Sequence, residues 1–154
     1  MDAAWLAVAL IEERAALERT ALVDALTGLP NQRALDAAVD RHAGTHPFGV
    51  LVLDFDGMRA ANAAFENDYA RGGDVLILAV ANVLEEFALE GELRCERLQG
   101  LLTDLDVPET HRHVYRGASV GGAARTPGEP VAETLARASR AMHERKRTRA
   151  TRSR

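Results

Sequence analysis

Phe48-Gly-Val-Leu-Val-Leu-Asp-Phe-Asp56 is the stretch that decides the fold, because a run of apolar residues ends there in two carboxylates. Alternate residues of a β-strand point to opposite faces, and neither face carries a polar side chain before Asp54. A strand that is apolar on both faces is typical of the middle of a sheet. The stretch therefore predicts a central strand that delivers acidic groups to one end of a sheet.

The two carboxylates, Asp54 and Asp56, share one face of this strand by the same alternation. Carboxylates at the end of a strand are oxygen ligands of the kind that hold Mg²⁺. Aspartate is also a good helix cap, and a helical pattern over residues 58–65 follows at once. The spacing alone favours the helix start and leaves the metal site open as an alternative.

The composition indicates a single domain with an uneven distribution of charge. A chain of 154 residues is long enough to form one hydrophobic core. The net charge of −4 divides into a basic stretch, residues 145–154 with six basic side chains and no acid, and a remainder with 13 basic against 23 acidic residues. One cysteine, Cys95, excludes an internal disulfide.

Residues 3–11 are the longest stretch that could enter a membrane, and they are too short to span it. The amino terminus also lacks the basic start of a secretory signal. We therefore expect a cytoplasmic protein with no membrane span.

An N-terminal helix is predicted over residues 3–23, which are rich in Ala and Leu at helical spacing. Its apolar seam is narrow, as in helices that pair with a second helix. The seam is shorter than the three or four heptads of a convincing coiled coil, so packing on its own domain is the equal alternative. Residues 3–23 are thus the expected contact with a second copy or with a partner helix.

Helices alternate with two strands along the rest of the chain. Turn residues and Pro30 precede a helix over residues 31–42 that is predicted to bury Leu35, Ala38 and Val39. The other predicted elements are a helix over residues 58–65, a helix capped by Asp74 that ends near Phe87, a helix around Leu98, a strand over residues 110–124, and a last helix from Pro130 with Val131, Leu135, Ala138 and Met142 inward.

Three further groups contain residue types that can carry chemistry, but their surroundings favour a structural role. Gly72-Gly73 precede a helix start, where free N–H groups can cradle a phosphate, yet an ordinary loop is the simpler interpretation. Cys95 has no His or Cys at metal spacing, which indicates a small buried hydrophobe. His111 and His113 share one face of the predicted strand, and we expect a solvated edge there rather than a metal site.

Five sequence blocks follow one another in a recognisable order. They are Asp24-Ala-Leu-Thr-Gly-Leu-Pro-Asn-Gln-Arg33, Asp54-Phe-Asp-Gly-Met-Arg-Ala-Ala-Asn62, Gly73-Asp-Val-Leu76, Ala118-Ser-Val-Gly121 and Ala141-Met-His-Glu-Arg-Lys-Arg147. In turn they resemble the motifs DxLTGLxNRR, DxDxFKxxND, GDxLL, ASIG and AMYxAKR of GGDEF domains, the diguanylate cyclases. The resemblance covers nearly the whole chain.

This resemblance implies an α+β fold, a truncated palm-like domain of the nucleotide-cyclase kind with a small central sheet flanked by helices. The domain would span residues 24–147, after an N-terminal helix over residues 1–23 that serves as a stalk or dimerisation element. A basic tail, residues 148–154, would follow it.

GGDEF domains join two GTP molecules into cyclic di-GMP, one in each half of a dimer, with Mg²⁺ on the phosphates. Carried over by motif, the resemblance implies that Asp54 is a metal ligand and that Asn62 and Asp74 bind guanine. It also implies that Lys146 faces the phosphates. Amide and carboxylate groups can read the edge of guanine, and a lysine neutralises a triphosphate as a point charge.

The hairpin that gives the family its name is missing from its expected place. Only Ala88-Leu-Glu-Gly-Glu92 stands between the helix that starts at Asp74 and the helix around Leu98. In the family this hairpin supplies the second metal carboxylate, glycines that admit the nucleotide, and two strands. No catalytic residue can therefore be assigned, and Mg²⁺ is expected only if a nucleotide still binds.

A competing alignment places the RxGGDEF motif at Arg71-Gly-Gly-Asp-Val-Leu76, where Val75 and Leu76 replace Glu and Phe. The residues that follow keep a helical period through Phe87, whereas the hairpin needs alternating strands, so the first alignment is preferred. Both alignments lose the signature acid. A third explanation is that the sequence lacks a segment of the natural protein.

The leading hypothesis is a degenerate GGDEF domain that makes no cyclic di-GMP and acts as a nucleotide-responsive or dimerising module, with GTP or another guanine nucleotide as its ligand. One alternative is an active cyclase whose acid comes from Asp56 or Asp68. Another is binding of nucleic acid or an anionic surface through residues 145–154, which the acidic remainder disfavours.

Loss of the hairpin also leaves the Phe48–Asp56 strand without one neighbour. A bare apolar edge promotes aggregation unless something covers it. We expect this edge to be covered by an element foreign to active cyclases, for example across a dimer.

Overall fold

The computed structural model describes residues 21–152 except residues 43, 45–46, 67 and 90–93. The chain divides into two compact units between Arg41 and His42, and each is described by itself. The helix predicted over residues 3–23 lies outside the described residues as far as residue 20. Residues 21–23 form a turn and a bridge rather than a helix. No helix in the described part is long and apolar enough to cross a membrane.

In the first unit, the polar residues and the glycine of the block at residues 24–33 form a turn. The Asp24 carboxylate accepts hydrogen bonds from the N–H groups of Leu26 and Thr27, at 3.2 and 2.9 Å, and from the Thr27 hydroxyl at 2.8 Å. The Thr27 N–H bond is the main cause of a lowered Asp24 pKa. Gly28 has a φ of 72°, a left-handed conformation that favours glycine. The block is a self-bonded turn.

Asn31 starts the helix that follows this turn. Its side-chain oxygen accepts from the N–H groups of Arg33 and Ala34, and its amide group donates to the carbonyls of Ala21 and Val23. The predicted helix start is confirmed, since α2 spans Gln32–His42. The predicted burial on this helix is wrong, because no residue of α2 is buried and Leu35 is 52% exposed.

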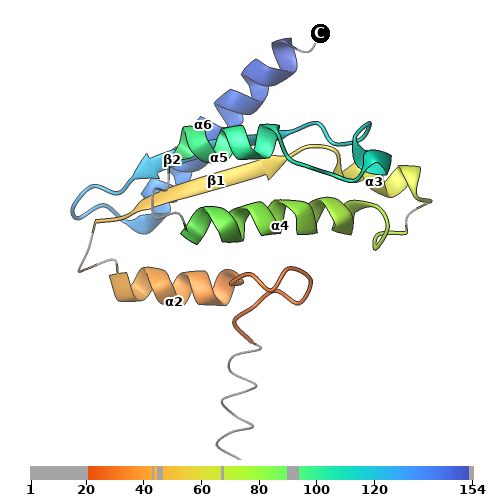
Figure 1. Ribbon diagram of the computed structural model, residues 1–154. Coiled ribbons are helices and arrows are strands. Elements are labelled where there is room, and N and C mark those ends of the chain that lie inside the picture. The colour runs from red at the N-terminus through yellow and green to blue at the C-terminus, as the bar shows by residue number, and fades with distance from the viewer. Residues whose placement is uncertain (1–20, 43, 45–46, 67, 90–93, 153–154) are drawn as a thin grey trace, which may run out of the picture. The chain divides into compact units, whose positions relative to one another are not determined.

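The second unit is built on two antiparallel strands (Figure 1), β1 at Gly49–Phe55 and β2 at Ala118–Ala124. Gly49 lies opposite Ala124, and Phe55 lies opposite Ala118. The described sheet has two strands only, so the expectation of a central strand is wrong for this part of the chain. The α+β class is confirmed.

Helices cover both faces of this sheet. α4 at Gly73–Leu89 and α5 at Cys95–Thr103 pack on one face, and α6 at Val131–Arg152 packs on the other. α3, at Met58–Ala64, connects the end of β1 to α4 through a turn. The main core lies on the face of α4 and α5 and contains Val80, Phe87, Leu98, Leu102, Ala118 and Val120.

Close backbone contact between β2 and α6 sets the rotation of α6. A Cβ atom at Gly121 would overlap the carbonyl oxygen of Ala138 and the amide nitrogen of Met142. With this rotation Thr134 is fully buried, whereas Leu135, predicted to point inward, is 45% exposed. The predicted inward positions of Ala138 and Met142 are confirmed.

The segment before β2 is not the extended strand that was predicted from residue 110. Residues Glu109–His111 form a 3₁₀ turn, and His111 is buried rather than on a solvated edge. Its ring stacks on Phe65 with centroids 4.7 Å apart, and its Nε2 atom lies 2.8 Å from the carbonyl oxygen of Arg71. His111 therefore fastens the turn between α3 and α4, while His113 is exposed as expected.

Candidate functional site

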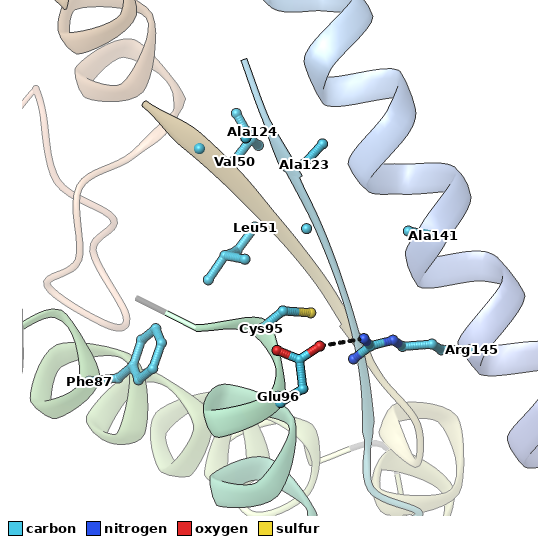
Figure 2. A pocket seen from close by; sticks show the side chains of 11 residues that line it. Val50, Leu51, Phe87, Cys95, Glu96, Ala123, Ala124, Ala141 and Arg145 are labelled. Carbon is cyan, nitrogen blue, oxygen red and sulfur yellow. Dashed lines mark hydrogen bonds and ion pairs between the residues drawn. The ribbon is translucent and has the colours of Figure 1, made fainter. Parts of the chain in front are cut away.

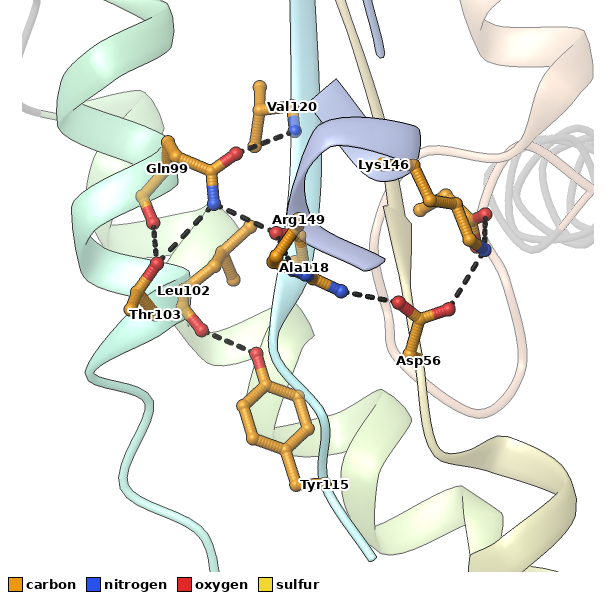
Figure 3. A network of polar contacts seen from close by, with 10 residues as sticks. Asp56, Gln99, Leu102, Thr103, Tyr115, Ala118, Val120, Lys146 and Arg149 are labelled. Atoms are coloured by element: carbon orange, nitrogen blue, oxygen red, sulfur yellow. Dashed lines mark hydrogen bonds and ion pairs between the residues drawn. The ribbon is translucent and has the colours of Figure 1, made fainter. Parts of the chain in front are cut away.

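Two carboxylates at the end of β1 meet two cations of α6 (Figure 3). The Nζ atom of Lys146 lies 2.5 Å from Asp54 Oδ2 and 2.8 Å from Asp56 Oδ1. The Arg149 guanidinium bonds the other oxygen of Asp56. We call these four residues the carboxylate site.

The strand and the helix place these side chains by simple periodicity. Asp54 and Asp56 are two residues apart in an extended segment and so point to the same face, toward α6. Lys146 and Arg149 are three residues apart on α6 and lie on one side of it. The sequence motif indicates Lys146 but not Arg149, and helical spacing was the only available signal for the arginine. Arg149 also donates to the carbonyl oxygen of Ala118.

Charge pairing dominates the electrostatics of the carboxylate site. Hydrogen bonds to Asp54 and then to Asp56 raise the pKa of Lys146. The four side chains are each about a third exposed, so solvent screens their attraction. Nearby, burial raises the pKa of Tyr115 to about 12, and its hydroxyl donates to the carbonyl oxygen of Leu102. Two positive groups thus balance two negative groups without help from a ligand.

The described residues do not fit a magnesium site. Mg²⁺ needs oxygen ligands in near-octahedral arrangement, and the two acids here already bind Lys146 and Arg149. In the described part of the chain no group of three Asp, Glu, His or Cys side chains could hold a metal. Asp54 is placed where its motif predicts, but its nearest cation is a lysine.

The predicted guanine-binding residues Asn62 and Asp74 lie together at a second place, where α3 meets the start of α4. The Asn62 side-chain oxygen accepts a hydrogen bond of 2.7 Å from the Gly73 N–H. Asp74 follows in the first turn of α4, so the prediction that it caps this helix is wrong.

The glycines beside these residues serve close packing. A Cβ atom at Gly73 would lie 2.7 Å from the Asn62 oxygen, and one at Gly72 would lie 2.9 Å from the Ala61 carbonyl oxygen. The N–H groups of Gly72 and Gly73 bond to Asp68 and Asn62. These amides are engaged, so an ordinary loop, rather than a phosphate cradle, is confirmed.

A shallow cleft of about 390 Å³ lies beside the carboxylate site. Three cationic side chains line it, those of Arg59, Arg116 and Lys146, together with Asp56. Gly57 forms its floor with a φ of 118°, and a Cβ atom there would overlap the carbonyl oxygen of Val114. The cleft offers positive charge at the end of β1.

The basic stretch at the end of the chain is helical as far as Arg152. Arg145 pairs with Glu96 at 3.0 Å, and Lys146 and Arg149 bind the carboxylate site. Arg145, Lys146 and Arg149 therefore have acidic partners among the described residues.

No family model matches the sequence. Among curated proteins, the chain is 26% identical to the diguanylate cyclase DgcZ of Escherichia coli (strain K12) over an alignment of 153 positions. The alignment covers 82% of this chain and 50% of DgcZ, so the chain spans half the length of this relative.

Solved structures resemble the chain over most of its length. The coiled coil and GGDEF domain of DgcB from Caulobacter crescentus, in complex with c-di-GMP, has a TM-score of 0.77 at 23% identity and covers 96% of this chain and 92% of that one. The diguanylate cyclase SiaD of Pseudomonas aeruginosa, in complex with its activator SiaC, has a TM-score of 0.62 at 23% identity, covering 93% and 65%. The chain has the fold of the GGDEF domain of DgcB.

In the structure of this chain, α4 ends at Leu89 and α5 begins at Cys95. The connection, residues 90–94, is too short for two strands and a turn. The two acids considered as substitutes do not fill the gap. Asp56 is bound by Lys146 and Arg149, and Asp68 lies exposed in the turn between α3 and α4.

Proposed function

We propose that this GGDEF-type domain works in cyclic di-GMP signalling without making cyclic di-GMP. The observation that carries this proposal is the position of Lys146, whose ammonium group bridges Asp54 and Asp56. Its charge occupies the place at which the family's chemistry requires a divalent cation.

The charge of Lys146 and Arg149 disfavours a bound Mg²⁺. Mg²⁺ would have to displace Lys146 from both carboxylates and Arg149 from one of them. Mg²⁺ commonly binds one or two carboxylates together with phosphates and water, but both carboxylates here are already neutralised by Lys146 and Arg149. Without Mg²⁺, the charge that develops on transferred phosphates has no compensation of comparable strength. Phosphoryl transfer is therefore disfavoured at this site.

Binding of a guanine nucleotide is the activity that the remaining residues support. The Asn62 side-chain oxygen accepts a hydrogen bond from the Gly73 N–H, and Asp74 is the next residue in the first turn of α4. The cleft with Arg59 and Arg116 could accept phosphates near Lys146. A domain of this kind would report GTP or cyclic di-GMP to a partner. Residues 3–23 are the proposed contact with that partner or with a second copy.

The proposal is tested by incubating the full chain with GTP and Mg²⁺ and measuring cyclic di-GMP by chromatography, with DgcZ as positive control. We expect no product above the level without protein. Product that disappears in Asp54→Asn would contradict the proposal.

Nucleotide binding is tested separately by calorimetry with GTP, GDP and cyclic di-GMP, with and without Mg²⁺. We expect heat with at least one nucleotide, independent of Mg²⁺, that is lost in Asp74→Asn and kept in the matched variant Asp68→Asn. Absence of heat with all three would leave a dimerising scaffold as the function.

A further inference from the structure

The two strands leave two outer edges, and their hydrogen-bonding groups can be assigned from the register. The Arg125 N–H bonds to the Phe48 carbonyl, and the Asp56 N–H bonds to the Gly117 carbonyl. Hydrogen-bonded and non-bonded residue pairs alternate along an antiparallel ladder. The backbone N–H and C=O groups of the even-numbered residues of β1 therefore point toward β2. The outward groups are therefore those of odd-numbered residues on β1 and even-numbered residues on β2.

Side chains close the outer edge of β2. The Gln99 side-chain oxygen accepts from the Val120 N–H at 2.9 Å, and its amide group donates to the Ala118 carbonyl at 2.8 Å (Figure 3). One glutamine amide thus replaces the peptide group of a missing neighbour strand. The Cys95 thiol donates to the Val120 carbonyl, and Arg137 donates to the Ala124 carbonyl at 2.5 Å.

The remaining outward position on β2, Gly122, lies in a cleft of about 550 Å³ between α5 and α6. The ion pair of Glu96 and Arg145 connects these two helices beside it (Figure 2). Since α5 and α6 lie on opposite faces of the sheet, this ion pair passes around the edge of β2. A further strand cannot approach there without breaking it.

Among the described residues, no side chain protects the outer edge of β1 in this way. Its outward groups belong to Gly49, Leu51, Leu53 and Phe55, and within the described residues no hydrogen bond reaches them. No residue of β1 is fully buried, whereas Ala118–Gly121 of β2 are. The stretch from Gly49 to Leu53 also lacks the charges and prolines that natural edge strands use against pairing.

The helix layer is wider than the sheet beneath it. α4 and α5 contact each other and share one core, with α5 over β2 and α4 beyond it toward the β1 side. A packed helix takes about 10 Å and a strand about 4.8 Å, so two helices cover about four strands. The described sheet supplies two. Leu51 points toward Phe87 of α4 (Figure 2), and Val83 and Leu84 of α4 are only partly buried against the core.

We propose that the outer edge of β1 binds a β-hairpin supplied by a partner protein, which completes the sheet under α4. The inner face of this hairpin would carry apolar residues toward α4. Its other face would be polar, because α6 packs mainly on β2 and leaves that side open. This inference does not depend on whether the domain binds a nucleotide.

A second copy of this chain does not fit the same edge. Pairing β1 with its own copy would give four strands, about 20 Å wide. It would also bring four helices to one face, which need about 40 Å. A hairpin adds strands without adding helices, and so it widens the sheet alone.

The test uses the full ¹⁵N-labelled chain and a synthetic hairpin peptide. The peptide has two arms as long as β1, Val and Thr in alternation, and an Asn-Gly turn. The control peptide is identical but carries N-methyl groups on the amides that would bond to β1. We expect the hairpin to slow amide exchange at Leu51 and Leu53 by about ten-fold or more, and the control to have no effect.

Two variants at Gly49 sharpen the test. Gly49→Pro removes one outward N–H group without removing a side chain, and Gly49→Ala keeps that group. We expect roughly five-fold weaker hairpin binding in the proline variant and unchanged binding in the alanine variant.

Three results would overturn the proposal. One is the absence of protection by the hairpin at millimolar concentration. The second is protection of Leu51 and Leu53 in the free monomer, which would mean that the chain covers its own edge. The third is protection that rises with protein concentration, which would assign the edge to a second copy.

Discussion

The two edges of the sheet differ in how their peptide groups are satisfied. On β2, side chains bond to outward backbone groups of Ala118, Val120 and Ala124. The Glu96–Arg145 ion pair lies beside the fourth outward position, Gly122. On β1, the described residues provide no partner for the outward groups. A protein that closes one edge with side chains from two helices and leaves the other edge apolar has an asymmetry that calls for a physical explanation.

The backbone edge of β1 also differs from the side chains at the end of this strand. The carboxylate site lies at the end of β1, and its charges are balanced within the chain by Lys146 and Arg149. The backbone groups on the β1 edge thus have no partner among the described residues, whereas the side chains of Asp54 and Asp56 at its end are paired. The acidic residues therefore hold α6 on the sheet, and the proposed hairpin contact lies along the strand edge.

The largest expected loss of stability comes from disrupting the contact between β2 and α6. Gly121→Ala would place a methyl group against backbone atoms of Ala138 and Met142 in α6. Backbone atoms cannot move aside as a flexible side chain can, so we expect the free energy of unfolding to fall by about 3 kcal/mol or more. Gly122→Ala is the matched control, because its methyl group meets the flexible end of Leu51. Urea unfolding measures both. Equal losses would show that α6 does not pack as described.

A smaller loss of stability is expected when the side chain that closes the outer edge of β2 is removed. Gln99→Ala removes the hydrogen bonds to Ala118 and Val120, and we expect a loss of about 2 kcal/mol in unfolding free energy. Amide exchange at Val120 should become faster. Thr103→Ala is the control, since Thr103 contacts the same glutamine but not the strand. Unchanged exchange at Val120 in Gln99→Ala would contradict the description of a closed edge.

The carboxylate site should give a smaller, pH-dependent effect. Lys146→Met removes a partly exposed ion pair, so we expect a loss of about 1 kcal/mol in unfolding free energy at neutral pH. Arg147→Met, one residue along on the exposed side of α6, is the control.

The sign of the pH dependence follows from the raised pKa of Lys146 in the folded state. Its stabilisation is complete below the unfolded value of about 10.5 and is lost as the pH rises through the folded value. The difference between the wild type and Lys146→Met should therefore shrink above that pH. A difference that grows there would contradict the pairing.

Glu129 should give the smallest effect, at acidic pH. Hydrogen bonds from Arg137, and then from the Thr126 N–H, lower the Glu129 pKa to about 2. The same Arg137 bonds Ala124 at the end of the β2 edge. A lowered pKa stabilises the fold above the unfolded value of about 4.5, and this stabilisation is lost as the pH falls toward about 2.

We therefore expect the urea midpoint of Glu129→Gln to lie below that of the wild type at pH 6 and to approach it as the pH falls from 4.5 toward 2. Glu133→Gln, which removes an exposed acid in the first turn of α6, is the matched control. A midpoint difference that is constant down to pH 3 would contradict the role of Glu129.

Much of the fold could be predicted from the sequence, because local chemistry determines it. Asn31 caps a helix through its own side chain, and the turn around Asp24 bonds within itself. The apolar stripe of α4 follows the period of a helix, and the structure buries Leu76, Val80 and Phe87 as the period predicts.

The rest depends on contacts between distant segments, which periodicity does not contain. Leu135 has the right spacing for the core, but the contact of α6 with Gly121 rotates the helix and buries Thr134 instead. His111 lies in a stretch with strand-like composition, yet it bonds to Arg71, forty residues earlier in the chain. Gln99 gives no signal of its role, since its partners lie on β2.

The candidate site shows the same division. Its motifs indicate Asp54 and Lys146 individually, but only the fold shows that they bind each other.

The most direct test of this account is amide hydrogen exchange along both strands of the free protein, measured by NMR on the full chain. We predict slow exchange at Val50, Val52 and Val120, whose N–H groups bond to a neighbour strand or to Gln99. At Leu51 and Leu53 we predict exchange close to that of an unprotected strand edge. Slow exchange at Leu51 and Leu53 in the free monomer would contradict the account, because it would show that the edge of β1 is already closed.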